Sequence, residues 1–392
     1  MIRRTSGRVL TLIVACVVSA QMSCWRENPK ELAKLPARYT GNCLDSSQAW
    51  EVFKRARYYP NGTALSMCIL EGDSDIYIGI ERRNDSLVYI ENRDSVFEIG
   101  SITKTFTGTI LAKLVYEGRV RPEDPIQKFL PVPLHQSSLN GEEVRLVHLA
   151  NHTSGLPFEP ANVREGKEHA FDPYDPYKYY STEALHEYLS NEMVLVSTPG
   201  ERRLYSNLGG GLLGYILTCV TKKSYEELVS ESICTPLGMQ HTFVELRPER
   251  ERWMVQGRDQ NGRPLPFGGG DCGALAGCGG IKSSARDLVK YIRANMRDTT
   301  YFDLAQKTTK QFDEHFTGSL AWATYSENGS HHVGAFGATG GYTCGLIFER
   351  SRRVGIVLLT NVSAFMPSQE NNVERLCRAL YDPLVSAGRG KN

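Results

Sequence analysis

The sequence predicts an α+β fold: an antiparallel β-sheet from N- and C-terminal segments, flanked by helices, with an all-helical inserted lobe. Three observations in the 392 residues support this prediction. β-rich runs separated by turn residues fill residues 64–99, and further β-rich runs fill residues 342–359. Between them, residues 119–260 combine helical periodicity with Pro- and Tyr-rich loops. The two ends are therefore expected to build one sheet, with a cleft between sheet and lobe.

Turn residues and hydrophobic periodicity define the elements in order. Polar turns divide the first β-rich region into strands at residues 64–70, 76–81, 87–91 and 96–99. The next helix starts at Ser101 and is predicted to end at Gly118, because apolar residues recur at helical spacing as far as Val115. Ser284 and Asp287 form a capping box for a later helix. The last predicted elements are strands at 342–348 and 354–359 and a helix at 368–380.

Ser101-Ile102-Thr103-Lys104 lies where the fourth strand turns into a helix. Residues three apart share a helix face, so the Ser101 hydroxyl and the Lys104 amine are expected side by side. A serine hydroxyl needs a base to become nucleophilic, and free N–H groups at a helix start can stabilise an oxyanion. The motif therefore indicates an acyl-transfer nucleophile, although chance alone produces it about once or twice in such a chain.

The composition is that of a globular protein, with 41% hydrophobic residues, 23% charged residues and a formal net charge of +1. This balance gives no electrostatic basis for binding nucleic acid or an anionic membrane surface. The sequence has no glycine fingerprint for phosphate and no Cys/His cluster with zinc spacing. We therefore expect neither a metal nor an organic cofactor.

Residues 1–23 are typical of an export signal, with arginines before an apolar run that is short for a membrane span. Cleavage is expected either before Gln21 or before Cys24, which would then carry lipid as in a bacterial lipoprotein. The protein is therefore expected to be secreted, periplasmic or anchored to a membrane by that lipid. A leader and helix at 24–57 and one main domain at 58–385, with the helical insertion, are predicted to follow.

The ten cysteines agree with an exported protein. Without Cys16 and Cys24 an even number of eight remains, so disulfides are expected in an oxidising compartment. Cys272 and Cys278, which close a glycine-rich loop, are the favoured pair, and a zinc site there is the weaker alternative. Five Asn-x-Ser/Thr sequons keep eukaryotic secretion open beside the bacterial periplasm.

Two later motifs carry groups that suit the same chemistry. Tyr205-Ser206-Asn207 precedes a glycine-rich apolar helix. A phenol near a lysine can relay a proton, and an Asn amide can hold a carbonyl or orient that lysine. Residues 337–342 are rich in glycine, which lets a substrate backbone approach a strand closely. Each motif alone also fits a half-buried aromatic residue or a simple turn.

Together these motifs resemble the serine β-lactamase and penicillin-binding protein family, specifically its class C-like branch with DD-peptidases and esterases. That family carries Ser-x-x-Lys, then Tyr-x-Asn, then Lys-Thr-Gly or His-x-Gly. The first two stand here as Ser101/Lys104 and Tyr205/Asn207. Flanking segments at 149–157 and 279–288 also look like family landmarks. The resemblance covers residues 60–380 and implies the β-lactamase/transpeptidase-like fold.

The third motif departs from the family pattern. Ala338-Thr339-Gly340 is taken as its counterpart, so the Lys or His that helps to hold a substrate carboxylate is missing. His331 or His332 would substitute only if a bulge turned one of them inward, and ordinary loop histidines are the favoured interpretation. The missing group weakens the expectation of penicillin hydrolysis more than that of acyl transfer.

The resemblance implies a serine hydrolase with an acyl-enzyme mechanism. Ser101 attacks a carbonyl while Lys104, Tyr205 or both accept its proton. The backbone N–H groups of Ser101 and Gly341 are expected to hold the oxyanion. Tyr205 then protonates the leaving group and later activates water.

The resemblance also implies the substrate contacts and the substrate class. Asn207 would bind the acyl side-chain amide or orient the lysine, and Thr339, Gly340 and Gly341 would line the substrate. The expected substrate is a D-Ala peptide such as a peptidoglycan stem peptide, a β-lactam or a small ester, with no nucleic-acid partner. A catalytically impaired, penicillin-recognising sensor or scaffold is the alternative, and Ala338 is the feature that favours it.

Overall fold

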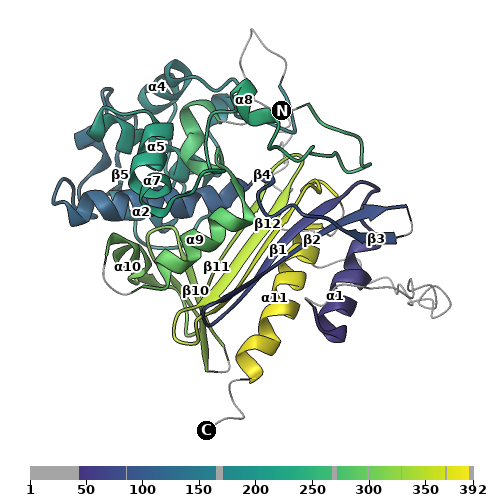
Figure 1. Cartoon of the computed structure of the whole chain (residues 1–392). Helices are drawn as coiled ribbons and strands as arrows, with labels where there is room; N and C mark the ends of the chain where they lie inside the picture. Colours follow the sequence, from purple (N-terminus) through teal and green to yellow (C-terminus); the bar gives the residue numbers. More distant parts are fainter. Residues whose placement is uncertain are drawn as a thin grey trace, which may run out of the picture. The chain divides into compact units, whose positions relative to one another are not determined.

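The computed structural model describes residues 44–84, 86–164, 171–266, 272–297, 300–327, 329–366 and 369–387. Gly41–Asn392 forms one compact unit. The predicted signal segment and Cys24 lie outside the described residues. The fold is α+β, as predicted, with one large sheet and a helical region (Figure 1).

A nine-stranded antiparallel sheet has the strand order β3-β2-β1-β13-β12-β11-β10-β9-β8. The first and last strands of the chain meet at its centre, where Leu65 of β1 pairs with Thr360 of β13. This pairing confirms that both ends of the chain build one sheet. The strands are β1 (Ala64–Glu71), β2 (Ser74–Arg83), β3 (Ser86–Tyr89), β8 (Lys310–Gln311), β9 (Phe316–Gly318), β10 (Ala323–Glu327), β11 (Ser330–Ala338), β12 (Thr343–Glu349) and β13 (Val354–Thr360).

Helices cover both faces of the sheet, and its central strands are buried along their whole length. Every residue of β12 and β13 is buried. α11 (Gln369–Ala387) packs on these strands and contacts α1 (Ser46–Ala56), while α9 (Ala285–Asn295) packs on β1 and β13. Figure 1 shows α11 and α1 on one side of the sheet and α9 with the helical region on the other. The helix predicted for the leader, α1, therefore packs within the same compact unit.

The predicted helix starts and stops follow their local signals. α2 (Thr103–Tyr116) ends before Gly118, which adopts a positive φ of 70°. The Ser284 hydroxyl caps α9 by accepting a hydrogen bond from the Asp287 amide. α2 is buried on almost every side, and Phe106, Ile110 and Leu111 are fully buried. This burial makes α2 the central helix of the helical region and a rigid base for the residues at its start.

The helical region between the two halves of the sheet also contains one short hairpin. Its turn, Asn140-Gly141, has positive φ at both residues, as two-residue hairpins require. The elements of this region are η3 (Ile126–Phe129), β5 (Ser138–Leu139), β6 (Glu142–Glu143), α3 (Leu146–Ala150), η4 (Ala161–Arg164), α4 (Thr182–Asn191), α5 (Asn207–Thr221), α6 (Tyr225–Val229), the π-helix η5 (Ser230–Cys234), α7 (Thr235–Leu237), α8 (Pro248–Glu251), η6 (Gly273–Cys278) and α10 (Tyr301–Gln306).

A small second sheet connects the large sheet to the helical region. β4 (Val96–Glu98) pairs with β7 (Lys282–Ser284), and Glu98 lies opposite Lys282. The chain leaves β4 through a single 3-10 turn, η2 (Gly100–Ile102), and enters α2 directly. Both β11 and β12 contact η2. The start of α2 is therefore held against the large sheet.

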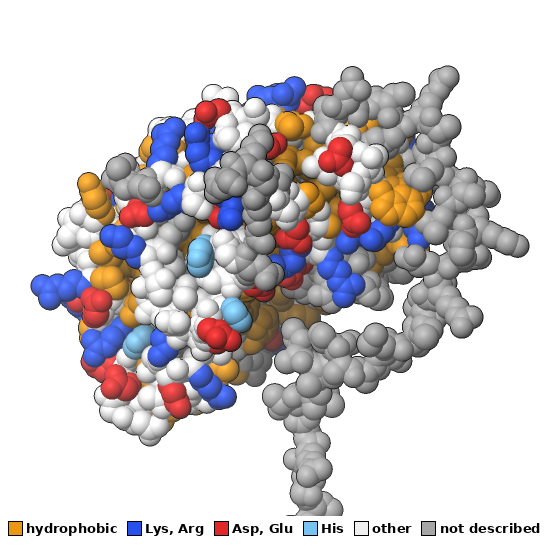
Figure 2. Space-filling view, turned by 90° about the horizontal axis from the view of Figure 1, so that it is seen from below, with side chains coloured by type: hydrophobic (Ala, Val, Ile, Leu, Met, Phe, Trp, Pro, Cys, Tyr) orange, Lys and Arg blue, Asp and Glu red, His pale blue; other side chains and the backbone are white. Residues whose placement is uncertain are grey.

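Basic and acidic side chains are intermingled on the face of the molecule in Figure 2. This mixture agrees with the formal net charge of +1. Within the described ranges, no helix is long and apolar enough to cross a membrane.

His331 and His332 lie at the start of β11, far from Ser101. The exposed His331 shares a hydrogen bond with Ser326 (2.9 Å), while His332 is only 5% exposed and lies between the rings of Tyr325 and Tyr381. His332 lies five residue steps, roughly 17 Å, from Gly337, which is at the other end of β11. Neither histidine replaces the missing cation, as expected, but both belong to a strand and not to a loop.

We expect His332 to make the fold sensitive to acid. Burial and the nearby Arg378 lower the pKa of His332, although Glu327 and Glu349 oppose the shift. The unfolded chain therefore binds a proton that the folded chain excludes, and stability is lost as the pH falls below about 6.5. His332→Phe should reduce the fall in melting temperature between pH 7 and pH 5, measured by differential scanning calorimetry. His331→Phe, at an exposed position, is the control, and an equal effect of both variants would contradict the prediction.

Candidate active site

Ser101 lies in the 3-10 turn at the start of α2, directly after the small sheet. Gly100 makes this turn possible with a φ of +49°. The structure thus places Ser101 at a helix N-terminus, as the sequence predicted. The neighbouring Ile102 is fully buried, which anchors the turn.

Lys104 lies one helical turn after Ser101 and is only 4% exposed. Its Nζ donates hydrogen bonds to Ser101 Oγ (3.0 Å), Asn207 Oδ1 (2.8 Å) and the Cys278 carbonyl (2.8 Å). Three acceptors match the three N–H groups of an ammonium. The side chain therefore holds a positive charge beside the serine, with every donor in use.

Tyr205 approaches Ser101 from the opposite side. Its hydroxyl donates to Ser101 Oγ at 2.6 Å, and Lys104 Nζ lies 4.9 Å from the centre of its ring. The side chain is 38% exposed, so one edge faces solvent. Ser101 Oγ thus lies between a phenol that can exchange a proton with solvent and a fixed cation.

His152 supports the ring of Tyr205, and the sequence analysis did not identify it as a site residue. The two ring centres lie 4.5 Å apart, and the Ser206 amide donates to His152 Nδ1 (3.3 Å). Burial, together with Lys104 and Arg203, holds the pKa of His152 well below its usual range. A neutral imidazole therefore packs against the Tyr205 ring, tilted by 37°. The only sequence signal was its place in the family-like segment 149–157.

Asn207 begins α5, where Ser206 caps the helix. Its Oδ1 accepts from Lys104, and its Nδ2 donates to the Tyr177 hydroxyl at 3.2 Å. Tyr177 is buried, and sequence reasoning did not single it out as a site residue. No local motif marks it, since it reaches Asn207 from a loop thirty residues earlier.

The end of β11 forms the sheet side of the site. β10 pairs with β11 only as far as Gly334. Along residues 335–338, the edge of β11 that faces away from β12 therefore lies beside η2 and not beside another strand. A Cβ on Gly337 would collide with the Ile99 carbonyl and lie 2.8 Å from the Ser101 nitrogen. A Cβ on Gly100 would likewise lie 2.6 Å from the Ala338 nitrogen. The backbone of this strand therefore lies directly beside Ser101.

Ala338, and not the predicted Gly341, is the residue whose backbone N–H group faces the Ser101 side of β11. The Thr339 amide bonds to the Tyr342 carbonyl (2.9 Å), so the next pair, Ala338 with Thr343, is a non-hydrogen-bonded one. In such a pair the N–H group points away from the partner strand. The Ala338 N–H therefore points from β12 toward the edge where Ser101 lies.

Thr339, Gly340 and Gly341 lie beyond this edge, in the turn between β11 and β12. A Cβ on Gly341 would meet Gly257 at 3.1 Å, and the backbone of Tyr174 covers Gly340. The structure thus does not bring these three residues against Ser101. The spacing of residues 337–342 in the sequence could not show that β11 ends at Ala338.

The third family motif consequently lies three residues earlier than predicted. Gly337 is the glycine that packs on Ser101, so the motif is Ala335-Phe336-Gly337. Ala335 lies two residues before Gly337, so both residues face the same side of the strand. In the family pattern, Lys-Thr-Gly or His-x-Gly, the Lys or His stands at the position that Ala335 occupies here. The predicted loss of a cation therefore remains, at Ala335 and not at Ala338.

Two carboxyl groups, those of Glu98 and Asp175, lie near the buried side chain of Lys282. Lys282 Nζ donates to the Val244 carbonyl at 2.7 Å. Burial raises the pKa of Glu98, although the Lys282 ammonium opposes the shift. Burial and the nearby Glu98 raise the pKa of Asp175 to about 6. The net charge of the group formed by Glu98, Asp175 and Lys282 therefore changes at mildly acidic pH.

Cys272 and Cys278 lie next to each other, with their thiols in a hydrogen bond. This bond and burial raise the pKa of Cys272 well above its usual value, while the same bond and Lys104 lower that of Cys278. Every cysteine in the described part of the chain is a free thiol. Their proximity agrees with the favoured pair, and the disulfide itself stays a prediction. The described residues contain no group of three or more His, Cys, Asp or Glu that could hold a metal ion.

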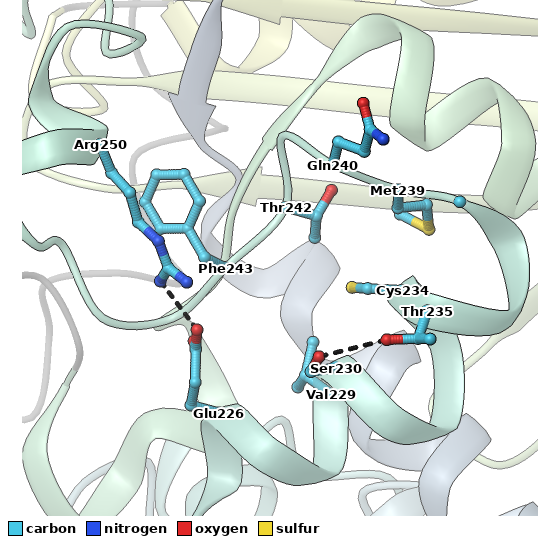
Figure 3. A pocket seen from close by; sticks show the side chains of 11 residues that line it. Glu226, Val229, Ser230, Cys234, Thr235, Met239, Gln240, Thr242, Phe243 and Arg250 are labelled. Atoms are coloured by element: carbon cyan, nitrogen blue, oxygen red, sulfur yellow. Dashed lines mark hydrogen bonds and ion pairs between the residues drawn. The ribbon is translucent and has the colours of Figure 1, made fainter.

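A separate cavity of about 350 Å³ lies elsewhere in the helical region (Figure 3). Glu226 and Arg250 form an ion pair there (2.7 Å), and Arg250 lies over the Phe243 ring. The amides of Val244 and Glu245 also donate to the Glu226 carboxylate. The Glu226 and Arg250 charges in this cavity are therefore already paired with each other.

Comparison with known proteins agrees with this geometry. The Beta-lactamase family profile matches residues 86–379. The D-alanyl-D-alanine-carboxypeptidase/endopeptidase AmpH of Escherichia coli K12 is 29% identical over 249 residues, 62% of this chain and 60% of that protein. A Pseudomonas fluorescens Beta-lactamase is 28% identical over 240 residues, 59% of each chain. The match thus spans about 60% of the length of these relatives.

Solved structures of similar proteins share the fold. A Beta-lactamase/D-alanine Carboxypeptidase from Yersinia pestis superposes with a TM-score of 0.70 at 22% identity, covering 86% of this chain and 99% of that one. A penicillin-binding protein homologue from Pyrococcus abyssi gives a TM-score of 0.68 at 26% identity, covering 87% and 77%. The chain therefore belongs to the beta-lactamase family of serine hydrolases, in the class C-like branch that includes AmpH and the beta-lactamases.

Proposed function

We propose that this protein is an exported hydrolase that cleaves ester or amide bonds through an acyl-enzyme on Ser101. The observation that carries the proposal is that Ser101 Oγ lies within hydrogen-bond distance of both Tyr205 (2.6 Å) and Lys104 (3.0 Å). A nucleophile between a proton acceptor and a cation is the arrangement that acyl transfer requires.

In the proposed reaction, Tyr205 accepts the Ser101 proton as Oγ attacks the substrate carbonyl. The Lys104 ammonium stabilises the phenolate form of Tyr205 that accepts this proton, while the N–H groups of Ser101 and Ala338 stabilise the oxyanion. Collapse of the tetrahedral intermediate breaks the bond to the leaving group, which takes the proton from Tyr205. Water, activated by Tyr205, then hydrolyses the acyl-enzyme and regenerates Ser101.

The substrate class follows from the charges around Ser101. Ala335 leaves no cation at the position where the family holds a substrate carboxylate, which favours a small neutral ester over a β-lactam or a D-Ala peptide. The name of AmpH describes that protein as a D-alanyl-D-alanine carboxypeptidase. Stem peptides therefore remain the second class to be tested.

Export is part of this proposal. The arginines, apolar run and cleavage sites of residues 1–24 support a secreted, periplasmic or Cys24-lipidated protein. A Cys272–Cys278 disulfide would suit such a compartment. Intact mass of the natural protein reports cleavage, lipidation and disulfide formation together.

Covalent labelling tests the proposed chemistry. Purified mature protein is incubated with a fluorophosphonate, with benzylpenicillin and with p-nitrophenyl butyrate, and its intact mass is measured. We expect fluorophosphonate labelling on Ser101 and rapid ester turnover. Lack of both would overturn the proposal, while a lasting penicillin adduct without ester or peptide turnover would support the sensor.

A second test concerns the space for Lys104. A Cβ on Gly210 would lie 2.9 Å from Lys104 Cε, so Gly210→Ala must displace the lysine side chain. We expect ester kcat/KM to fall by about 100-fold, since small misplacements of a catalytic group have effects of this order. Gly209→Ala, whose Cβ would make only 3.4 Å contacts with Ser206, is the matched control. Equal activities of the two variants would contradict the prediction.

A further inference from the structure

We infer that Tyr177 determines acyl specificity by occupying the Asn207 amide, so that the enzyme favours acyl groups without an acylamino substituent. This inference rests on the proposed function. The sequence left two roles for Asn207, which were to bind a substrate amide or to orient Lys104. The structure assigns it the second role.

Both polar atoms of the Asn207 side chain are already in use. Oδ1 accepts from Lys104 Nζ at 2.8 Å, which fixes the orientation of the amide. Nδ2 then points away from the lysine and donates one of its two N–H groups to the Tyr177 hydroxyl at 3.2 Å. An acylamino carbonyl that approaches this N–H group must therefore compete with a partner from the protein itself.

Tyr177 is a strong competitor because it is buried. Its side chain is only 6% exposed, and this burial raises its pKa above the ordinary tyrosine value, so it stays a neutral phenol. A substrate carbonyl that displaced it would leave the buried hydroxyl without this partner. Such a loss cancels most of the gain from the new hydrogen bond.

The segment that carries Tyr177 is anchored at both ends. Beyond Tyr177, the Tyr180 carbonyl accepts from the Ala274 amide in η6 (2.8 Å). Before it, the Tyr174 hydroxyl donates to Gln260 (2.7 Å). The backbone of Tyr174 covers Gly340, where a Cβ would lie 2.6 Å from Tyr174 Cα. Tyr177 is therefore held at Asn207 from two sides.

The same segment also packs beside the β11–β12 turn. Tyr174 lies across the backbone of Gly340. The ring of Tyr174 packs edge-on against the ring of Phe365, with the two ring centres 5.4 Å apart. These contacts add to the anchoring of the segment that carries Tyr177.

Two esters with the same leaving group and equal acyl length test the inference. The p-nitrophenyl esters of N-acetylglycine and pentanoic acid differ only in the amide. Tyr177→Phe removes the hydroxyl and frees Asn207 Nδ2. We expect the ratio of kcat/KM for N-acetylglycine to that for pentanoate to rise about tenfold over wild type, as one uncontested hydrogen bond predicts. Comparing ratios between proteins cancels the intrinsic reactivity of the esters.

Tyr180→Phe is the matched control, because its hydroxyl donates to Asn162 (2.8 Å) and does not reach Asn207. Its ratio should equal that of wild type. Turnover of both esters with an unchanged ratio in Tyr177→Phe would overturn this inference alone. If no protein hydrolyses either ester in a Ser101-dependent manner, the proposed function and this inference fall together.

Discussion

Replacing Ser101 with alanine is expected to abolish ester turnover and fluorophosphonate labelling together. Both Tyr205 and Lys104 contact this hydroxyl, so its removal leaves them without a nucleophile to activate. The loss of kcat should be on the order of 10⁴-fold or more, as when the nucleophile of a serine protease is removed. Stopped-flow release of p-nitrophenol and intact mass report the two effects independently.

The variant must also remain folded for this result to be informative. Ser101 is half-buried and carries little apolar surface, so Ser101→Ala should melt within a few degrees of wild type. Ser95→Ala removes a hydroxyl outside the site and serves as the activity control. Retained turnover in Ser101→Ala would contradict the acyl-enzyme mechanism.

Tyr205→Phe should lower kcat/KM by about 10²- to 10⁴-fold, the range that a positioned acid or base contributes. The change removes the hydroxyl that lies 2.6 Å from Ser101 Oγ and keeps the ring that packs against His152. Binding surface and packing are therefore preserved while the proton relay is lost.

Tyr116→Phe provides the control for Tyr205→Phe, because Tyr116 is 67% exposed at the end of α2. Its activity should equal that of wild type. If Tyr205→Phe kept more than about a tenth of the activity, Lys104 would have to be the proton acceptor. Lys104→Met should then show the larger loss.

Several elements could be predicted because their signals are local. The helix after Ser101 follows from apolar residues at helical spacing and from Gly118, whose positive φ ends it. The fully buried strands β12 and β13 follow from unbroken apolar runs. Ser101 and Lys104 are one helical turn apart, so their proximity also follows from backbone geometry alone.

The position of the third motif could not be predicted from its residues. Residues 337–341 contain three glycines, and any of them suits a close backbone approach. The pairing of β11 with β12 and the contact of Gly337 with Ser101 decide which residue lies at the strand end. Both are interactions between segments distant in sequence, so the predicted oxyanion donor was three residues too late.

The sequence by itself determined the fold class, the family-like motifs and the Ser101–Lys104 pair, since each depends on short-range periodicity or on spacing within one helix. Only the tertiary structure decided that Ala338 faces Ser101, that His152 supports Tyr205 and that Tyr177 occupies Asn207. These contacts join residues tens to hundreds of positions apart. Their geometry depends on how the sheet, α2 and α5 pack together, and no local sequence pattern encodes that packing.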